Sequence, residues 1–229
     1  MTPRLILFDL DGTLVNTGGA GLRAFDRSME EEFGPGMTLD TITPAGMTDT
    51  AIFREIFSHN RGRSPVKTEE ERLFVRYLKY LEEEIAVSEG FRVLPGVREI
   101  LEELADDNRF LVGLGTGNLE TGARIKLERP ALNGYFSFGG FGSDSSDRPE
   151  LLRQGVKKGL EAAGRTGESG VVIVIGDTPR DVSAGKAIGA RTLAVASGPY
   201  SRTELQKSEP DLAVDDLCDS TALAAWFLS

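Results

Sequence analysis

The sequence contains very little of the two residue types that most often bind zinc: one histidine, His59, and one cysteine, Cys218, in 229 residues. A zinc site made of several histidine or cysteine side chains is therefore excluded. A Ser-His-Asp triad would have to use His59, and the G-x-S-x-G motif that carries many nucleophilic serines is absent. A lone cysteine cannot form an internal disulfide, so we expect a reducing compartment, the cytoplasm. If the protein is an enzyme, carboxylates and cations carry out its chemistry.

Long apolar runs and an excess of positive charge are also missing. No run of about 18 apolar residues exists, so we expect no membrane-spanning helix. Asp9 and Asp11 interrupt the apolar run near the N-terminus, which is unlike a signal peptide. The net charge of −10 argues against broad binding to nucleic acid or to a membrane surface. Apolar residues make up 40% of the chain, enough for one large domain or a domain with an insert, while the oligomeric state stays open.

Four short apolar runs predict strands buried on both faces of a parallel sheet, because they are nearly continuous in apolar character. They cover residues 4–8, 110–114, 171–175 and 192–196. Amphipathic helical patterns lie between these runs, at residues 97–106, 119–128 and 150–163. Strands that alternate with helices predict an α/β fold with a doubly wound, Rossmann-like parallel sheet. The apolar segment LAAWF near the C-terminus is interpreted as a helix docked on this core.

Residues 16–90 break this alternation. They contain no convincing strand, and their helical patterns cover residues 20–33, 49–58 and 69–87. The VLPGV segment at residues 93–97 then marks the return to the sheet, with a Pro-Gly turn. We therefore predict an all-helical cap at 16–90, inserted after strand one into a Rossmann-like catalytic core formed by residues 1–15 and 91–229.

Carboxylates follow two of the predicted strands, at the ends where ligands bind in open α/β sheets. Asp9 and Asp11 follow the first strand and point to the same side of an extended chain, because they are two residues apart. Asp177 and Asp181 follow the strand at 171–175. Two like charges about 4 Å apart repel by ~4 kcal/mol at an effective dielectric constant of about 20. One carboxylate could stay protonated, or the groups could be solvated loop residues, but a divalent cation with oxygen ligands, Mg²⁺, explains their convergence better.

A further predicted strand, at residues 110–114, ends in the sequence GTGN. Thr116 offers a hydroxyl, while Gly117, Asn118 and the start of the next helix offer backbone N–H groups. This arrangement suits an anion such as phosphate. Two other interpretations are an N-cap alone and a near match to the dinucleotide fingerprint G-x-G-x-x-G, which has no use for the acidic residues.

The motifs DLDGTLV, GTGN and GDTPRDV, in this order and around a helical insert, resemble those of the haloacid dehalogenase superfamily of phosphohydrolases. The resemblance covers essentially the whole chain, and the insert is similar to the all-helical cap of phosphoglycolate-phosphatase-like and phosphoglucomutase-like members. It implies that Asp9 attacks phosphorus and forms an aspartyl-phosphate, and that Asp11 protonates the leaving oxygen and then activates water. It also implies that Asp9, the Asp11 carbonyl and Asp177 bind Mg²⁺. Asp181 then orients the waters of the metal.

The same resemblance implies which groups hold the transferred phosphoryl group. Thr116 contributes its hydroxyl to this catalytic task. The neighbouring backbone amides contribute further phosphate contacts, and we assign these contacts to Leu10, Gly117 and Asn118.

One motif departs from the family pattern. Family members usually carry a lysine near a Lys-Pro dipeptide after the third strand, where this sequence has Arg148 before Pro149. We expect Arg148 to take the place of that lysine in the active site, the alternative being a surface charge. Lys126 is a possible substitute, but it lies ten residues beyond Thr116. That separation is about 15 Å along a helix at 1.5 Å per residue, which we expect to be too far.

The cap is expected to determine which substrate binds. The segment PAGMTDTAIF, residues 44–53, resembles the cap loop that leans over the active site in such proteins. Gly46 and Thr48 are candidate substrate contacts, together with Thr17 and the glycines Gly18, Gly19 and Gly21 at the hinge. The alternative is that Gly46 ends a turn and that Thr48 or Asp49 caps the helix behind it.

These observations predict a Mg²⁺-dependent phosphatase that hydrolyses a small phosphomonoester through an aspartyl-phosphate. Its expected partner is a small phosphorylated metabolite, with no nucleic acid and no membrane. A phosphomutase with the same chemistry is the main alternative. A metal-independent dehalogenase is disfavoured because such members lack the second aspartate, Asp11. A receiver module would be half this length and would lack a cap, and loss of turnover in a pure binding protein has no support, since all the acidic positions are intact. The sequence does not name the phosphomonoester.

Overall fold

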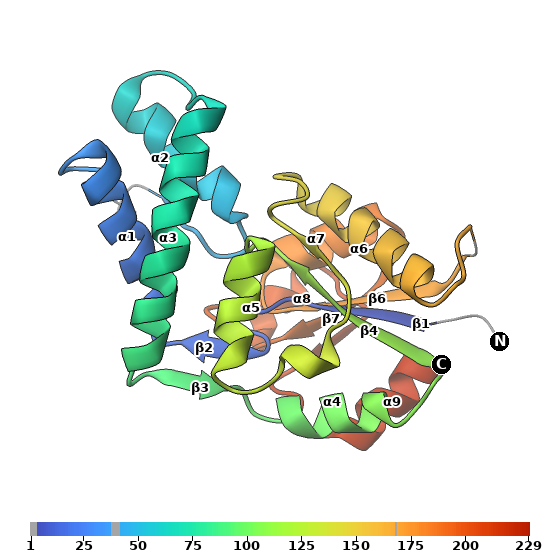
Figure 1. Cartoon of the computed structure of the whole chain (residues 1–229). Coiled ribbons are helices and arrows are strands. Elements are labelled where there is room, and N and C mark those ends of the chain that lie inside the picture. The colour runs from blue at the N-terminus through green and yellow to red at the C-terminus, as the bar shows by residue number, and fades with distance from the viewer. Residues whose placement is uncertain (1–3, 38–41, 168) are drawn as a thin grey trace.

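The computed structural model describes residues 4–37, 42–167 and 169–229. A six-stranded sheet with helices on both faces forms one part of the molecule, and three helices form a second part beside one edge of it (Figure 1). No helix among the described residues is long and apolar enough to cross a membrane. His59 is exposed in the last turn of helix α2 (Asp49–Arg61), and the single cysteine, Cys218, is free and exposed.

All neighbouring strands of the six-stranded sheet are parallel, in the order β5-β4-β1-β6-β7-β8. The strands are β1 (Arg4–Phe8), β4 (Phe110–Thr116), β5 (Gly139–Phe141), β6 (Val171–Gly176), β7 (Arg191–Val195) and β8 (Leu212–Val214). The predicted α/β fold with a doubly wound parallel sheet is confirmed. Phe8 at the end of β1 pairs with Leu114 of β4 and Ile175 of β6. This register brings the carboxyl ends of three strands to one edge.

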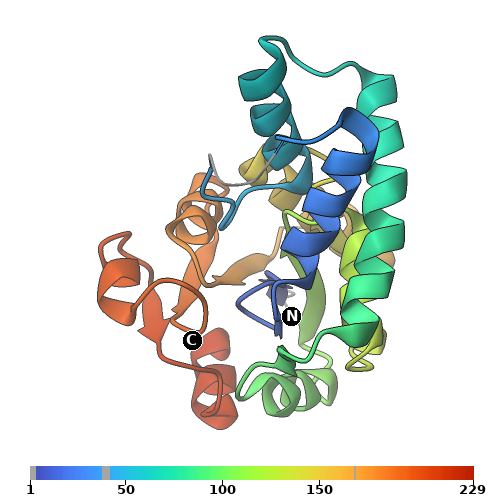
Figure 2. The same ribbon diagram turned by 90° about the vertical axis from the view of Figure 1, so that its left-hand side faces the viewer.

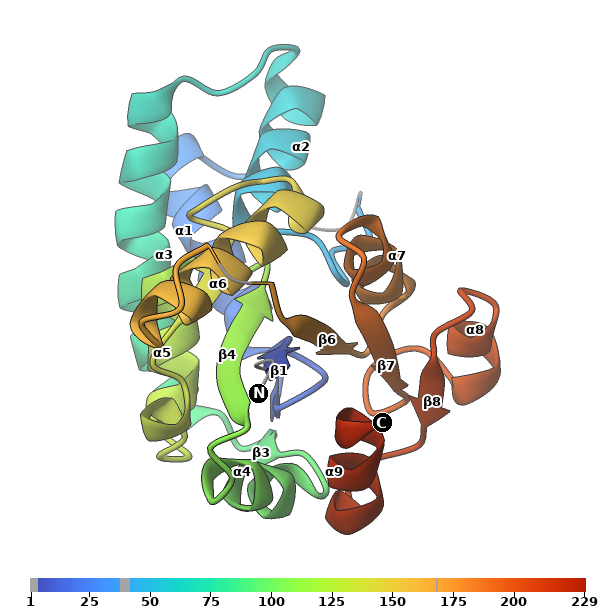
Figure 3. The ribbon, with the colours of Figure 1, turned by 90° about the vertical axis from the view of Figure 1, so that its right-hand side faces the viewer.

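Helices cover both faces of the sheet because the side chains of β1 alternate between two apolar clusters. Ile6 and Phe8 pack into the cluster that includes α4 (Val97–Ala105), α5 (Glu120–Glu128) and α9 (Ser220–Leu228). Leu7 packs on the opposite face, against α6 (Arg148–Ala162) and α7 (Pro179–Ala187). Figure 3 shows α4 and α9 on one side of the strands and α6 and α7 on the other. The LAAWF segment lies in α9, which docks on α4 as predicted. Short elements complete this part: the 3₁₀ helix η2 (Asn133–Tyr135) and α8 (Arg202–Gln206).

The second part consists of α1 (Ala20–Phe33), α2 and α3 (Lys67–Val87), which stand above the carboxyl edge of the sheet in Figure 2. Their shared apolar cluster is separate from those of the sheet and includes Ala24, Met29, Phe53, Leu73 and Leu81. Arginine–glutamate pairs tie α1 to α3 on the solvent side, for example Arg23 with Glu84 at 2.7 Å.

Two short antiparallel strands join the two parts, β2 (Val15–Thr17) and β3 (Phe91–Val93). The sequence pattern at 16–90 predicts no strand, and in this respect it was wrong: Thr17 pairs with Phe91 across the junction. Strands of three residues are too short to show a periodic pattern, and each is held by its partner. The division into a core and a cap at 16–90 stays our proposal, with β2 and β3 at the base of the cap.

Candidate active site

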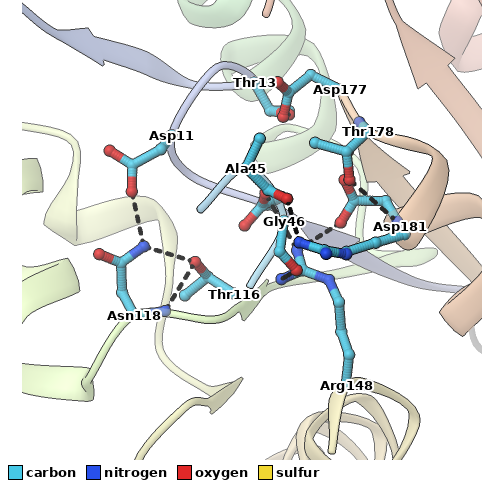
Figure 4. Close-up of polar contacts among 12 residues, drawn as sticks. Asp11, Thr13, Ala45, Gly46, Thr116, Asn118, Arg148, Asp177, Thr178 and Asp181 are labelled. Atoms are coloured by element: carbon cyan, nitrogen blue, oxygen red, sulfur yellow. Dashed lines mark hydrogen bonds and ion pairs between the residues drawn. The ribbon is translucent and has the colours of Figure 1, made fainter. Parts of the chain in front are cut away.

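Three carboxylates meet at the shared edge of β1 and β6. Asp9 follows β1, Asp177 follows β6, and Asp181 lies in the first turn of α7. Each has a carboxylate oxygen within 4.8 Å of the others, and all three residues are buried. Thr178 caps α7: its backbone N–H and its hydroxyl donate to Asp181 Oδ2 at 3.0 and 2.6 Å. Figure 4 shows the Asp181 carboxylate turned toward Thr178 and the Arg148 guanidinium.

The electrostatics of this cluster favour a bound cation. Burial, together with the negative charges of Asp181 and Asp9, raises the pKa of Asp177 to about 9. Burial also raises the pKa of Asp9 to about 6, although the Arg148 guanidinium and the Leu10 backbone N–H stabilise its charged form. Three hard oxygen donors whose charges repel one another are the donor set that Mg²⁺ prefers. The residues present therefore fit a divalent cation, which would relieve this repulsion.

Arg148 reaches the same cluster from the opposite direction. It is the first residue of α6, whose N-cap Asp147 accepts a hydrogen bond from the Glu150 backbone N–H. Its Nη2 lies 3.1 Å from Asp9 Oδ2 and also donates to Asp181 Oδ1, while Nη1 donates to the Gly46 carbonyl at 3.3 Å. The side chain is 9% exposed, and its Nε has no hydrogen-bond partner. Arg148 is thus a buried cation in contact with Asp9, not a surface charge.

A second polar network surrounds Asp11. Asn118 Nδ2 donates to Asp11 Oδ2 at 2.8 Å and to Thr116 Oγ1 at 2.9 Å. Lys126 Nζ donates to Asp11 Oδ2 and to Asn118 Oδ1, both at 2.6 Å. Figure 4 shows the Asp11 side chain turned toward Asn118. Thr116, at the end of β4, is fully buried beside this network.

The expectation that Lys126 lies too far from the site was wrong. Helix α5 begins only at Glu120, so Lys126 is about 9 Å along its axis at 1.5 Å per residue. Helical side chains lean toward the N-terminus of their helix, and a lysine spans ~6 Å in that direction. The sequence carried a signal that was missed: Lys126 lies beside Ala123 and Leu127 on the buried face of the helix. Lys157 and Lys158, by contrast, pair with Glu161 and Asp144 at the surface.

The loop before α2 rests directly on the strand ends. Arg180 Nη1 donates to the Ala45 carbonyl at 2.7 Å, and the Asp49 backbone N–H donates to the Gly117 carbonyl at 2.9 Å. Gly46 has a φ of 70°, and a side chain there would begin 2.6 Å from Thr178 Oγ1. A side chain at Gly117 would begin 2.4 Å from the Met47 carbonyl oxygen. Glycines at these two positions allow the loop to close over the site.

Thr48 and Asp49 have local partners in this loop. The Thr48 hydroxyl accepts a hydrogen bond from the Ala51 backbone N–H at 3.1 Å and so caps α2. Asp49 Oδ2 accepts one from the Leu119 backbone N–H at 2.9 Å. Burial raises the pKa of Asp49 to about 6, against the opposing effects of Lys126 and of that hydrogen bond. The structure therefore favours the capping interpretation of Thr48, while a substrate contact there stays a prediction.

A cavity of about 540 Å³ separates the strand ends from the helices α1 to α3. The sequence-predicted site residues that line it are Asp9, Asp11, Thr17, Gly46, Thr116, Gly117, Asn118, Arg148 and Asp177. Leu10, Thr48 and Asp181 are not in the lining: Leu10 packs in the core, and Asp181 lies behind Arg148. Lys126, which the sequence analysis placed too far away, also lines the cavity. Tyr77 lines it too, although nothing in the sequence around Tyr77 marks it as more than a core residue.

The family model of haloacid dehalogenase-like hydrolases matches residues 6–195 of this chain. The chain belongs to the haloacid dehalogenase-like hydrolases. The resemblance carried by DLDGTLV and GDTPRDV is thereby confirmed. This chain is 29% identical over 223 residues to a protein named pyrophosphatase PpaX from Listeria welshimeri, and the match covers 95% of this chain and 94% of that one. It is 27% identical over 225 residues to a protein named phosphoglycolate phosphatase from Aquifex aeolicus, across 96% of each chain.

Solved structures share the fold of this chain. A hydrolase from Pseudomonas syringae superimposes with a TM-score of 0.70 at 24% identity, over 99% of both chains. A β-phosphoglucomutase from Clostridium difficile superimposes with a TM-score of 0.74 at 19% identity, over 100% of this chain and 98% of that one. This haloacid dehalogenase-like hydrolase therefore combines the family fold with a cavity that places buried carboxylates, an arginine and a lysine around one space.

Proposed function

We propose that this protein is a Mg²⁺-dependent phosphatase that hydrolyses a small phosphomonoester through an aspartyl-phosphate on Asp9. The observation that carries the proposal is the surroundings of the Asp9 carboxylate. It lies at the cavity wall with the Arg148 guanidinium 3.1 Å away and two further carboxylates beside it. If Asp9 only stabilised the fold, its arginine partner would be enough. Two further buried carboxylates beside this pair would then have no role. The compartment we propose is the cytoplasm, in keeping with the single cysteine.

In the proposed reaction, an Asp9 carboxylate oxygen forms a bond to phosphorus while the bond from phosphorus to the leaving oxygen breaks. Asp11 gives a proton to that leaving oxygen and then takes one from the water that attacks the aspartyl-phosphate. The products are the free alcohol and inorganic phosphate, and Asp9 returns as a carboxylate. Thr116 and Arg148 contact the transferred phosphoryl group.

Backbone amides complete the phosphate contacts in this proposal, at Leu10, Gly117 and Asn118. Asp9, the Asp11 carbonyl and Asp177 would hold Mg²⁺, and Asp181 would act on it through water, because both of its oxygens already have protein partners. The bound ion would supply positive charge that offsets the negative charge of the phosphoryl group. Gly46, Thr48 and Thr17 stay the proposed contacts from the cap and hinge.

The names of the relatives bear on the substrate. One is called a pyrophosphatase and another a phosphoglycolate phosphatase. Both names describe small phosphorylated molecules, and they make a phosphoanhydride and a phosphomonoester the two substrate types to compare. A phosphomutase would use the same Asp9 chemistry but would return the phosphoryl group to a sugar.

The test is to incubate the protein with p-nitrophenyl phosphate and Mg²⁺, quench it with acid, and locate phosphate by mass spectrometry. We expect phosphate on Asp9 and stoichiometric release of inorganic phosphate. Asp9→Asn should carry no phosphate, whereas Asp11→Asn should form a phosphoprotein that turns over slowly, since this leaving group needs little protonation. Phosphate on another residue would refute the assignment. Transfer to a sugar acceptor without inorganic phosphate would favour the phosphomutase.

A further inference from the structure

Lys126 is a buried cation that the proposed reaction does not use. Its side chain is 5% exposed, and its ammonium nitrogen faces the cavity beside Asp11. The ammonium has three N–H donors. The structure gives it two hydrogen-bond acceptors among the described residues, Asp11 Oδ2 and Asn118 Oδ1. One donor is therefore left for a ligand in the cavity.

Tyr77 of α3 offers a second unused donor at the same place. It is 2% exposed, it lines the cavity, and no described residue forms a hydrogen bond with its hydroxyl. Burial holds the pKa of this phenol well above its usual value, and the nearby Asp49 and Asp11 carboxylates raise it further. The hydroxyl thus keeps its proton and is a donor. Because Tyr77 lines the cavity and its hydroxyl has no partner among the described residues, the hydroxyl can donate to a ligand there.

Gly21 shows that these two donors share one space. A methyl group at Gly21, in the first turn of α1, would lie 3.5 Å from Lys126 Nζ and 4.0 Å from the Tyr77 hydroxyl oxygen. Glycine destabilises a helix relative to alanine. Its presence here leaves the space between the ammonium and the hydroxyl open, and Gly21 itself lines the cavity.

We propose that Lys126 and Tyr77 bind an anionic group on the leaving alcohol. The preferred substrates would then be phosphomonoesters that carry a carboxylate or a second phosphate a few atoms from the ester oxygen. This inference rests on the proposed function, because the role of Asp11 as proton donor identifies its side of the cavity as the leaving-group side. An anion there meets a desolvated ammonium and a phenol, both of which strengthen as hydrogen-bond donors to a charged acceptor.

The alternative role for Lys126 is to position Asp11 alone. The two roles differ for a pair of substrates that have the same shape and different charge. Phosphoglycolate and its amide, phosphoglycolamide, both transfer phosphate from a two-carbon alcohol, and only phosphoglycolate carries a carboxylate. A residue that only positions Asp11 affects both substrates equally, whereas an anion-binding residue affects the carboxylate more.

The experiment measures kcat/KM for this pair in the wild-type protein, Lys126→Gln and Tyr77→Phe. We expect the wild type to favour phosphoglycolate over the amide by about tenfold or more, and Lys126→Gln to lose that preference. Tyr77→Phe, which removes only the hydroxyl, should lose part of it, and Lys126→Arg should keep part of it. Lys158→Gln, at a surface lysine paired with Asp144, is the matched control and should change neither substrate.

The outcomes separate the two proposals. A wild type that hydrolyses both substrates equally, or a Lys126→Gln variant that loses equal activity on both, overturns the anion site and leaves the phosphatase intact. A wild type that hydrolyses neither substrate nor p-nitrophenyl phosphate overturns the phosphatase, and the anion site with it. If Lys126→Gln fails to fold, as judged by circular dichroism, the Tyr77→Phe comparison decides: an unchanged preference overturns the proposal.

Discussion

The Arg148 guanidinium lies between two carboxylates, one that follows strand β1 and one in helix α7: its Nη2 is 3.1 Å from Asp9 Oδ2 and also donates to Asp181 Oδ1. A buried arginine needs such partners, since a desolvated cation without them is strongly unfavourable. The Nε of Arg148 nevertheless has none. The side chain therefore offsets the negative charge of the acidic cluster, and its Nε–H group remains free to donate a hydrogen bond to a ligand.

Arg148→Ala should lower kcat/KM for p-nitrophenyl phosphate by about 100-fold or more, on the order of 3 kcal/mol at 1.36 kcal/mol per tenfold change. The reason is the loss of a cation that contacts Asp9 and that, in the proposed reaction, contacts the incoming phosphoryl group. Arg148→Lys should recover only part of the rate, because one ammonium does not reproduce two guanidinium nitrogens. Steady-state kinetics on the three proteins provide the measurement.

Arg153→Ala is the control for this substitution, because Arg153 lies on the same helix but is exposed and pairs with Glu150. Its kinetics should match those of the wild type. If Arg148→Ala also retained wild-type kinetics with its fold intact, another cation would have to hold the phosphoryl group, and Lys126 would be the first to test.

Removal of divalent cations with EDTA should abolish hydrolysis, and added Mg²⁺ should restore it. Mg²⁺ should also raise the melting temperature, since a ligand that binds only the folded protein stabilises it. Asp177→Asn should melt higher than the wild type without metal, because burial beside Asp181 and Asp9 disfavours the ionised form that the Asp177 carboxyl adopts in the unfolded chain. The variant should also lose most of the response to Mg²⁺. Asp215→Asn, at an exposed residue, should keep the response. Full activity in metal-free protein would contradict the metal site.

Gly117→Ala should lower kcat/KM by about tenfold or more through contact with the cap loop. The new methyl group would lie 2.4 Å from the Met47 carbonyl oxygen, so the loop must move away from the strand ends. The φ of Gly117 does not lie in the left-handed region, so the effect is one of contact and not of backbone strain. Displacing a positioning element by ~1 Å is enough for a large loss of rate.

Gly134→Ala is the matched control for this change, because a side chain at Gly134 would meet no atom within 4 Å and its φ is also not positive. It should leave kinetics and melting temperature unchanged. Wild-type activity in Gly117→Ala would show that closure of the cap loop does not limit turnover.

Asp49 should make stability depend on pH in a defined window. Its pKa is raised from 3.8 to about 6 by burial, so the folded protein holds this proton more tightly than the unfolded chain. The resulting stabilisation is complete below pH 3.8 and is lost as the pH rises through about 6. Relative to Asp49→Asn, the wild type should lose about 1 to 2 kcal/mol of unfolding free energy between pH 5 and pH 8. Denaturant titrations at several pH values measure this, and a constant difference between the two proteins would contradict the shift.

Much of the site could be predicted because parallel strands bring their carboxyl ends to one edge. Asp9, Thr116 and Asp177 each follow a strand whose apolar pattern is plain in the sequence, and the register of β1 with β4 and β6 aligns those ends. Arg148 could be placed by its motif. The hinge strands could not be predicted, because three residues carry no pattern and pair only when the chain has folded.

The sequence alone determined the parallel α/β core, the family and the acidic residues at the strand ends. These features depend on local apolar patterns and on the order of short motifs. Only the tertiary structure decided which groups surround Asp11. Lys126 reaches it through the start and direction of α5, and Tyr77 reaches the same cavity from a helix about fifty residues earlier in the chain. The physical reason is that a side chain's reach depends on the packing of its whole helix against the sheet, which local sequence does not encode.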